Sequence, residues 1–215
     1  MSVGISAFLF LGACTSTPIE AEKTVTGEAG SAEGQWRGRA LLKNHKTSKS
    51  HTLSVDVLAR EPSQLRMEVG GPFNVHVASV AMNGGEVRCS LTQQKRFLFV
   101  PADSAALARV VPLKIPPRAL LAVLFERPLP KEEWTCDTYA LGELPVECSH
   151  KTEKVTIKWL ARNGLSRRIK IMAPETDVEM VLDEAKSKVQ FNDDAFVINP
   201  TEGYRVERAR SAARL

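Results

Sequence analysis

The sequence contains no run of about 20 apolar residues, the length that a helix needs to cross a bilayer. It also lacks the HExxH, CxxC and GxSxG patterns of metal, redox and serine-nucleophile sites, and it has no glycine-rich phosphate-binding loop. Its four histidines, at positions 45, 51, 76 and 150, have no metal-ligand spacing. These absences predict a protein that is not an enzyme and that holds no metal or cofactor.

An excess of charge of one sign is also missing. The net charge of +4 is scattered over 215 residues, with no long basic stripe, so we expect no nucleic-acid partner. The composition, 43% hydrophobic and 25% charged, is that of an ordinary globular chain with enough apolar residues for the core of one domain. We expect this domain to be a monomer.

The first residues suggest export. Residues 3–13, VGISAFLFLGA, carry no charge and fit the apolar core of a signal peptide, although no Lys or Arg precedes them. Leu11–Cys14 resembles a lipobox, in which small residues precede a cysteine that receives a diacylglycerol. The sequence therefore predicts a signal peptide at 1–13, lipid on Cys14 and a tether at 14–35. Thr15, where inner-membrane retention would favour Asp, predicts a lipid anchor at the periplasmic face of the outer membrane.

The remaining cysteines fall into two groups. Cys136 and Cys148 flank a segment with turn character around Gly142 and Pro145. Because an exported protein meets an oxidising compartment, a disulfide between them is one hypothesis, and two reduced cysteines on adjacent strands is the other. Cys89 alternates with apolar neighbours and is expected to be a small buried core residue.

From Trp36 onward the chain is dominated by alternation of apolar and polar residues, which is typical of strands with one buried face. Asn83-Gly84 and Asn163-Gly164 predict tight hairpins between such runs, because both residue types tolerate positive φ. The clearest alternating runs are 53–57, 65–69, 87–91, 155–159 and 178–182.

Two stretches depart from this alternation. Residues 102–111 are alanine-rich, and residues 116–125 begin with proline and are apolar almost all round, so each predicts a short helix. Strands, then helices, then strands predict a mainly β protein of the α+β class with a single antiparallel sheet. We expect this domain to occupy residues 36–206, followed by a basic tail at 207–215.

The segment Gly70-Gly71-Pro72-Phe73-Asn74 is an unusual turn, because a phenylalanine stands where hairpin turns carry polar residues. Phe73 could fold back onto the core. Alternatively, it could be an exposed apolar tip that touches lipid or an acylated client. The sequence leaves both hypotheses open.

Several motifs together resemble the LolB-like outer-membrane lipoprotein receptors. Gly38–Ala40 is similar to the first strand of that family, and Leu65–Phe73 to its apolar strand that runs into a proline and a protruding apolar residue. Pro112–Pro130 is similar to its helical region, although the tryptophan and glycine of the family pattern are missing, and Asn74 replaces a glycine. Phe196–Val206 is similar to the closing strand of the LolA-type fold.

This resemblance implies a sheet curled as an incomplete β-barrel, with a short helical lid enclosing an apolar cavity for acyl chains. It implies that the protein receives acylated lipoproteins, with a LolA-type periplasmic carrier as a partner, and inserts them at the outer membrane through Phe73. Alternatives with the same fold are a carrier of lipid or glycolipid, and a structural envelope-assembly lipoprotein. A plainly filled core also remains open. The residues expected to line the cavity are Leu53, Val55, Val57, Leu65, Met67, Val69, Leu120, Leu121 and Leu124.

Overall fold

The computed structural model describes residues 33–103, 106–109, 113–138, 144–187 and 189–209. The predicted signal peptide, Cys14 and most of the predicted tether lie outside these residues, as do positions 210–215 of the predicted tail. Among the described residues, no helix is long and apolar enough to cross a membrane.

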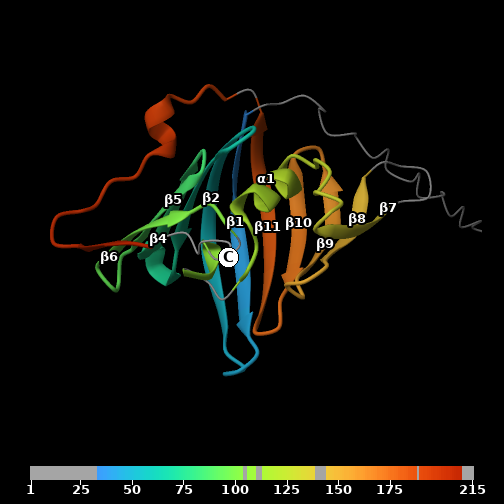
Figure 1. Ribbon diagram of the computed structural model, residues 1–215, viewed down its shortest axis with the longest axis horizontal. Helices are drawn as coiled ribbons and strands as arrows, with labels where there is room; N and C mark the ends of the chain where they lie inside the picture. The colour runs from blue at the N-terminus through green and yellow to red at the C-terminus, as the bar shows by residue number, and fades with distance from the viewer. Residues whose placement is uncertain (1–32, 104–105, 110–112, 139–143, 188, 210–215) are drawn as a thin grey trace, which may run out of the picture.

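The described chain forms a single twelve-stranded sheet with the order β12-β6-β5-β4-β3-β2-β1-β11-β10-β9-β8-β7 (Figure 1). Neighbouring strands are antiparallel, except that β12 pairs with β6 in parallel. The strands are β1 (Glu33–Asn44), β2 (Ser50–Arg60), β3 (Gln64–Gly70), β4 (His76–Asn83), β5 (Glu86–Leu91), β6 (Arg96–Pro101), β7 (Trp134–Thr138), β8 (Pro145–His150), β9 (Thr156–Asn163), β10 (Ser166–Met172), β11 (Thr176–Ser187) and β12 (Arg205–Arg208). The helical segments are α1 (Pro117–Leu124) and the 3-10 turns η1 (Pro72–Asn74), η2 (Leu107–Arg109) and η3 (Asp193–Phe196).

The alternation in the sequence places one face of each strand in the core. In β2, for example, Val55 and Val57 are buried, whereas Asp56 between them is only partly so. The predicted hairpins are confirmed, since Gly84 and Gly164 occupy the turns with φ of 65° and 55°. β1 begins at Glu33, three residues before the predicted domain boundary, and pairs with both β2 and β11 along its length.

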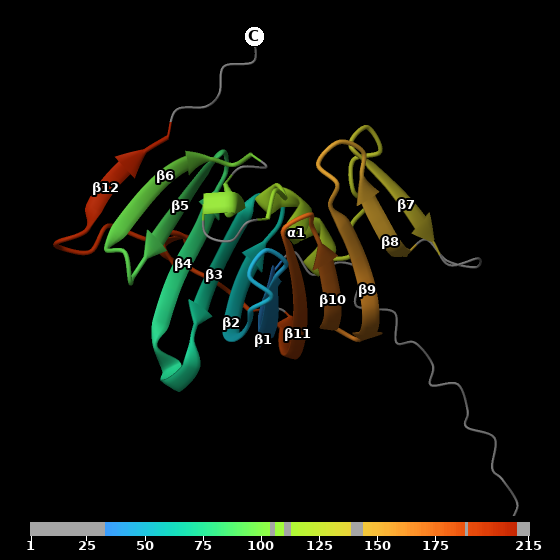
Figure 2. The same ribbon diagram turned by 90° about the horizontal axis from the view of Figure 1, so that it is seen from below.

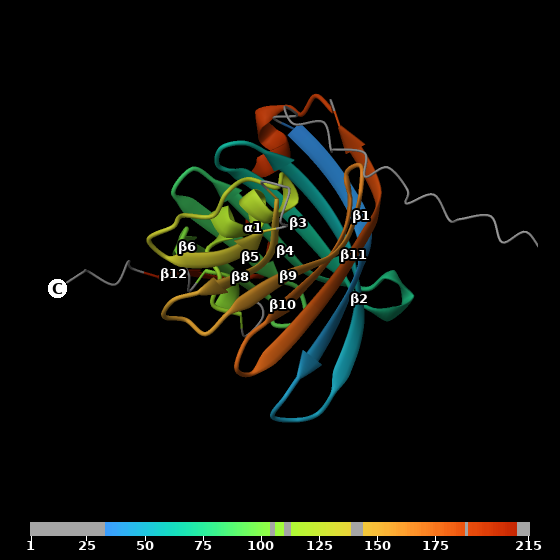
Figure 3. The ribbon, with the colours of Figure 1, turned by 90° about the vertical axis from the view of Figure 1, so that its right-hand side faces the viewer.

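The sheet is strongly curved but not closed, so the expected incomplete barrel is confirmed in outline (Figure 2). Its buried residues gather on the concave side, where α1 lies inside the curve (Figure 3). Of the two predicted helices, the one at 116–125 is confirmed by α1. Around the other, at 102–111, the described residues contain just the 3-10 turn η2.

The segment after β11 crosses the convex face before it reaches β12. Arg60 donates to the Phe191 carbonyl, Arg66 to that of Ala195 at 3.1 Å and Arg88 to that of Ile198 at 3.4 Å. These arginines come from β2, β3 and β5, so each fixes one point of the crossing segment. The predicted boundary between domain and tail at 206/207 falls inside β12, because residues 205–208 pair with residues 96–99 of β6.

Candidate functional site

The concave face of the sheet contains an apolar cavity of about 530 Å³. The side chains around it are almost all aliphatic, and its two polar side chains, His51 and Gln93, are exposed. The lining residues are Ala40, Leu42, His51, Leu53, Val55, Met67, Val69, Gly71, Pro72, Val75, Val77, Ala78, Gln93, Leu107, Leu113, Ile115, Leu120, Ile171, Val178 and Met180.

The cavity reaches one end of the sheet, which we call the mouth end. Antiparallel order brings the turns at residues 44–50, 71–75, 92–95 and 173–175 to this end. Two of these turns contribute to the lining, through Gly71, Pro72 and Val75 in one and Gln93 in another. The opposite end, where β1 begins, we call the far end.

Helix α1 explains why the cavity occupies only part of the concave face. The helix is apolar almost all round, and six of its eight residues are buried. Phe125, directly after it, packs edge-on against Trp36 with ring centroids 5.3 Å apart. Trp36 lies near the start of β1, so the helix fills the concave face toward the far end and leaves the mouth end unfilled (Figure 1).

Charged side chains hold the C-terminal end of α1 to both halves of the sheet. Glu126 accepts from Arg162 of β9 at 2.6 Å and pairs with Arg167 of β10 at 3.1 Å, and all three side chains are at most 10% exposed. On the other side, Arg127 makes two hydrogen bonds of 2.8 Å to Glu61, which follows β2. Burial lowers the pKa of the Arg167 guanidinium, while Glu126 opposes that shift.

The predicted cavity residues divide between the open and the filled parts. Leu53, Val55, Met67, Val69 and Leu120 line the cavity. The other four expected residues are instead packed in the core nearer the far end, each no more than 3% exposed, because α1 covers that part of the face. They are Val57, Leu65, Leu121 and Leu124.

Sequence reasoning missed the other half of the wall. Ala40, Ile171, Val178 and Met180 come from β1, β10 and β11, which follow β2 in the strand order because β11, far along the chain, pairs with β1. The alternation at Val178 and Met180 was visible in the sequence, but the partners of their strand were not. Among the described residues there is no group of three or more His, Cys, Asp or Glu side chains placed to bind a metal ion.

Phe73 lies at the mouth end and its side chain is 99% exposed. Its backbone is left-handed, with φ 60° and ψ 29°, a conformation that bulky L-residues rarely adopt. The turn is closed by Gly71 N–H donating to the Val75 carbonyl at 2.7 Å. Of the two hypotheses for this residue, packing on the core is therefore wrong.

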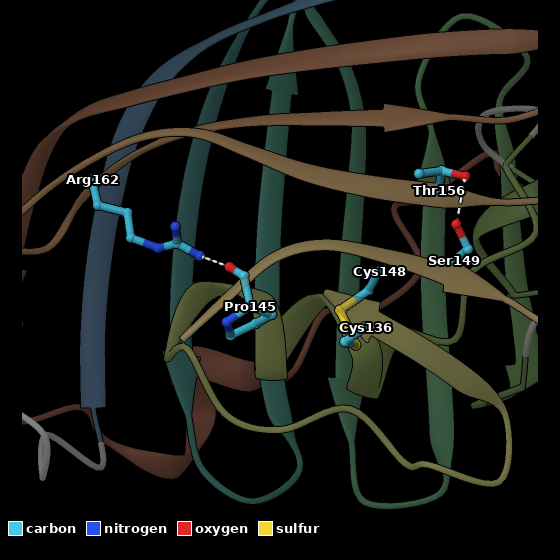
Figure 4. Close-up of a disulfide and its surroundings, with 6 residues drawn as sticks. All are labelled: Cys136, Pro145, Cys148, Ser149, Thr156 and Arg162. Atoms are coloured by element: carbon cyan, nitrogen blue, oxygen red, sulfur yellow. Dashed lines mark hydrogen bonds between the residues drawn. A yellow bond between two sulfur atoms is a disulfide. The ribbon is translucent and has the colours of Figure 1, made fainter. Parts of the chain in front are cut away.

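At one edge of the sheet, Cys136 of β7 and Cys148 of β8 form a disulfide (Figure 4). The two residues are directly opposite each other in the strand pairing. Ser149 and Thr156 share a hydrogen bond of 3.2 Å that links β8 to β9, and Arg162 donates to the Pro145 carbonyl. Cys89 is fully buried, as expected.

The convex face carries a polar cluster around Glu68. Its carboxylate accepts from Ser79 at 2.5 Å, from Arg66 at 2.7 Å and contacts His76 at 3.0 Å. Burial by itself would raise the pKa of Glu68, but these three hydrogen bonds outweigh it and the pKa lies below its ordinary value. The cluster is separated from the cavity by the sheet and ties β3 to β4.

No protein-family model matches the chain, and no curated protein does so either. Among solved structures it is similar to a DUF1329 family protein from Desulfovibrio piger, with a TM-score of 0.56 and 8% identity over 78% of this chain and 90% of that one. It is also similar to a LolA superfamily protein from Nitrosomonas europaea, with a TM-score of 0.45 and 7% identity over 78% and 91% of the two chains. A third similar structure is a domain from Vibrio parahaemolyticus that is described as an outer membrane lipoprotein-sorting protein. Its TM-score is 0.44, with 9% identity over 79% of this chain and 91% of that one.

At 8% identity, the first likeness shows a shared fold and nothing about activity. The two likenesses to LolA-type proteins are weaker, and no argument about this chain follows from scores of that size. The case for a function therefore rests on the cavity and the turn beside it.

Proposed function

We propose that this chain is a membrane-anchored lipoprotein that binds acyl chains in its cavity and inserts acylated lipoproteins at the outer membrane, as LolB-like proteins do. The observation that carries the proposal is the half-filled concave face. Its cavity of about 530 Å³ opens at the same end of the sheet as the exposed Phe73.

The lining supports an acyl ligand. A volume of this size lies within the range of small-molecule sites, roughly 300–1,000 Å³. Aliphatic walls offer no hydrogen bonds to a polar ligand, whereas each methylene taken out of water contributes about 0.8 kcal/mol. His51 and Gln93, exposed in the same lining, can contact the polar end of a chain whose apolar part lies deeper.

The position of Phe73 supports delivery rather than storage. An aromatic ring that is fully exposed in a left-handed turn gains nothing from burial and strains the backbone, so folding alone does not account for it. A ring at the mouth can enter the apolar layer of a membrane while the ligand leaves the cavity beside it. In this proposal lipid on Cys14 keeps the domain at that membrane, since two or more acyl chains anchor a protein stably.

Ligand binding tests the proposal directly. Purified protein is examined by native mass spectrometry for co-purifying lipid or lipoprotein, and it is titrated with a fluorescent fatty acid. Val69→Trp places a large ring in the cavity and should weaken fatty-acid binding at least tenfold, as a blocked site requires. Leu160→Trp, at an exposed position away from the cavity, is the matched control and should bind as the wild type does.

A wild-type protein that binds no fatty acid and carries no lipid would refute the acyl-binding proposal. So would a Val69→Trp protein with unchanged melting temperature and unchanged affinity. Lipid alone, with no lipoprotein, among the co-purifying molecules would favour a lipid carrier instead.

A further inference from the structure

The mouth end carries lysines on both sides of the Phe73 turn. Lys43, Lys46 and Lys49 lie on or beside the hairpin between β1 and β2, and Lys95 lies in the turn between β5 and β6. All four are exposed. Lys46 pairs with Glu175 at 2.6 Å, whereas Lys43, Lys49 and Lys95 form no ion pair with any other described residue.

This corner differs from the rest of the sheet. At the same end but on β7 to β9, bases and acids are in balance, with Lys131, Lys151 and Lys154 beside Glu132, Glu133 and Glu153. At the far end Glu61 pairs with Arg127 and Asp193 pairs with Arg60, so acidic and basic side chains are balanced there too. Lysines without an ion pair to a described residue therefore flank the cavity mouth on both sides of the Phe73 turn.

We propose that the mouth end is a docking surface for a bilayer that contains anionic phospholipids. Lys43, Lys49 and Lys95 contact the negatively charged headgroups, and Phe73 enters the apolar layer between them. This inference rests on the proposed function, because it specifies the surface onto which the cavity empties.

Simple electrostatics explains why the lysines and the ring act together. The field of an anionic surface reaches about one Debye length, roughly 8 Å at physiological salt, and it attracts basic side chains before contact is made. A single exposed ring binds weakly by itself, whereas each lysine near such a surface strengthens binding about fivefold.

Vesicle sedimentation tests the inference. The protein is the mature chain predicted to begin at position 14, carrying Cys14→Ser, so that neither the apolar segment 3–13 nor a lipid anchor contributes to binding. The vesicles are phosphatidylcholine, with or without a one-third share of phosphatidylglycerol. We expect binding only when phosphatidylglycerol is present, and a decline when salt rises from about 0.1 M to 1 M, where the Debye length falls to about 3 Å.

Two triple variants with the same change in net charge separate the patch from the overall charge. Lys43→Gln, Lys49→Gln and Lys95→Gln together should weaken binding to anionic vesicles on the order of 100-fold. Arg37→Gln, Arg39→Gln and Lys186→Gln together, on β1 and β11 outside the mouth-end turns, should lower it less than fivefold. Equal losses in the two variants, or equal binding to both kinds of vesicle, would overturn the docking surface.

Fatty-acid titration of the same proteins distinguishes this failure from failure of the proposed function. Both triple variants should keep the wild-type affinity for the fatty acid, because none of the six substituted residues lines the cavity. Normal fatty-acid binding with charge-independent vesicle binding overturns the docking surface alone.

Discussion

At the scale of single residues, Phe73 is the position where local preference and observed structure disagree most. Its left-handed backbone suits glycine, and its side chain contacts almost nothing. The sequence revealed an odd residue in a Gly-Gly-Pro turn but could not separate a tip from a core anchor. That choice depends on the backbone conformation of Phe73 itself, because Pro72 fixes its own φ and restricts Gly71 before it but not the residue that follows.

We expect substitutions of Phe73 to separate stability from delivery. Phe73→Gly removes a side chain from a left-handed position, so the free energy of unfolding should fall by no more than about 0.5 kcal/mol. Transfer of an acylated lipoprotein to membranes should nevertheless drop, and Phe73→Glu should lower it further, because a carboxylate opposes entry into the apolar layer. Thermal melting and a transfer assay with loaded protein measure the two effects.

Fatty-acid binding should survive in both variants, since Phe73 does not line the cavity. Leu160→Glu, at another exposed apolar position, is the control for a new surface charge. Unimpaired transfer by a stable Phe73→Glu protein would leave the phenylalanine without a role in delivery.

At the scale of secondary-structure elements, α1 determines how much of the concave face stays open. Its own sequence predicts burial, and six of its residues are buried as expected. The sequence could not predict which part of the sheet the helix covers. That depends on Glu126 and Arg127, which bind partners more than 30 residues away along the chain.

Breaking the buried ion pairs of Glu126 should destabilise the protein strongly. Glu126→Gln leaves the guanidinium groups of Arg162 and Arg167 buried without a counter-charge, which typically costs about 3–5 kcal/mol. Glu61→Gln, which breaks the more exposed pair with Arg127, should cost less than about 1 kcal/mol. Urea unfolding of the two variants provides the comparison, and similar costs would show that Glu126 does not fix the helix.

The elements themselves were predicted unevenly, for physical reasons. Alternation identified the strands well because each has one face in the core. A helix was predicted at 102–111 because alanine favours helices locally, but tertiary contacts decide whether a helix forms. Among the described residues of this stretch, only the 3-10 turn η2 is found. Val57 and Leu65 have the same alternation as Leu53 and Val69, so pattern alone could not tell cavity wall from filled core.

At the scale of the whole molecule, strand order lay beyond what the sequence could predict. β1 and β11 are neighbours although some 130 residues of chain separate them, and the parallel contact of β12 with β6 closes one edge. Nothing local encodes such pairs. The disulfide was easier to propose, because Cys136 and Cys148 belong to one hairpin and need only a short turn between them.

The direction of β1 sets a length requirement on the segment that precedes it. β1 begins at the far end and runs its twelve residues, about 40 Å, toward the mouth. If the mouth end rests on the membrane, the segment between a lipidated Cys14 and Glu33 has to span the full length of β1. Eighteen residues lie between them and span at most about 60 Å, so the segment reaches Glu33 when it is about two-thirds extended.

The length of the segment between Cys14 and Glu33 should therefore control the delivery of lipoprotein without affecting the folded domain. Deleting residues 17–24 leaves a reach of about 35 Å, too short for the mouth to meet the membrane that holds the anchor. Transfer of lipoprotein into that same membrane should be lost, while fatty-acid binding and melting temperature stay unchanged. Replacing the eight residues with a Gly-Ser segment of equal length should restore transfer, which would show that their number matters and their identity does not. Full transfer by the shortened protein would mean that the domain works on a different membrane from the one that anchors it.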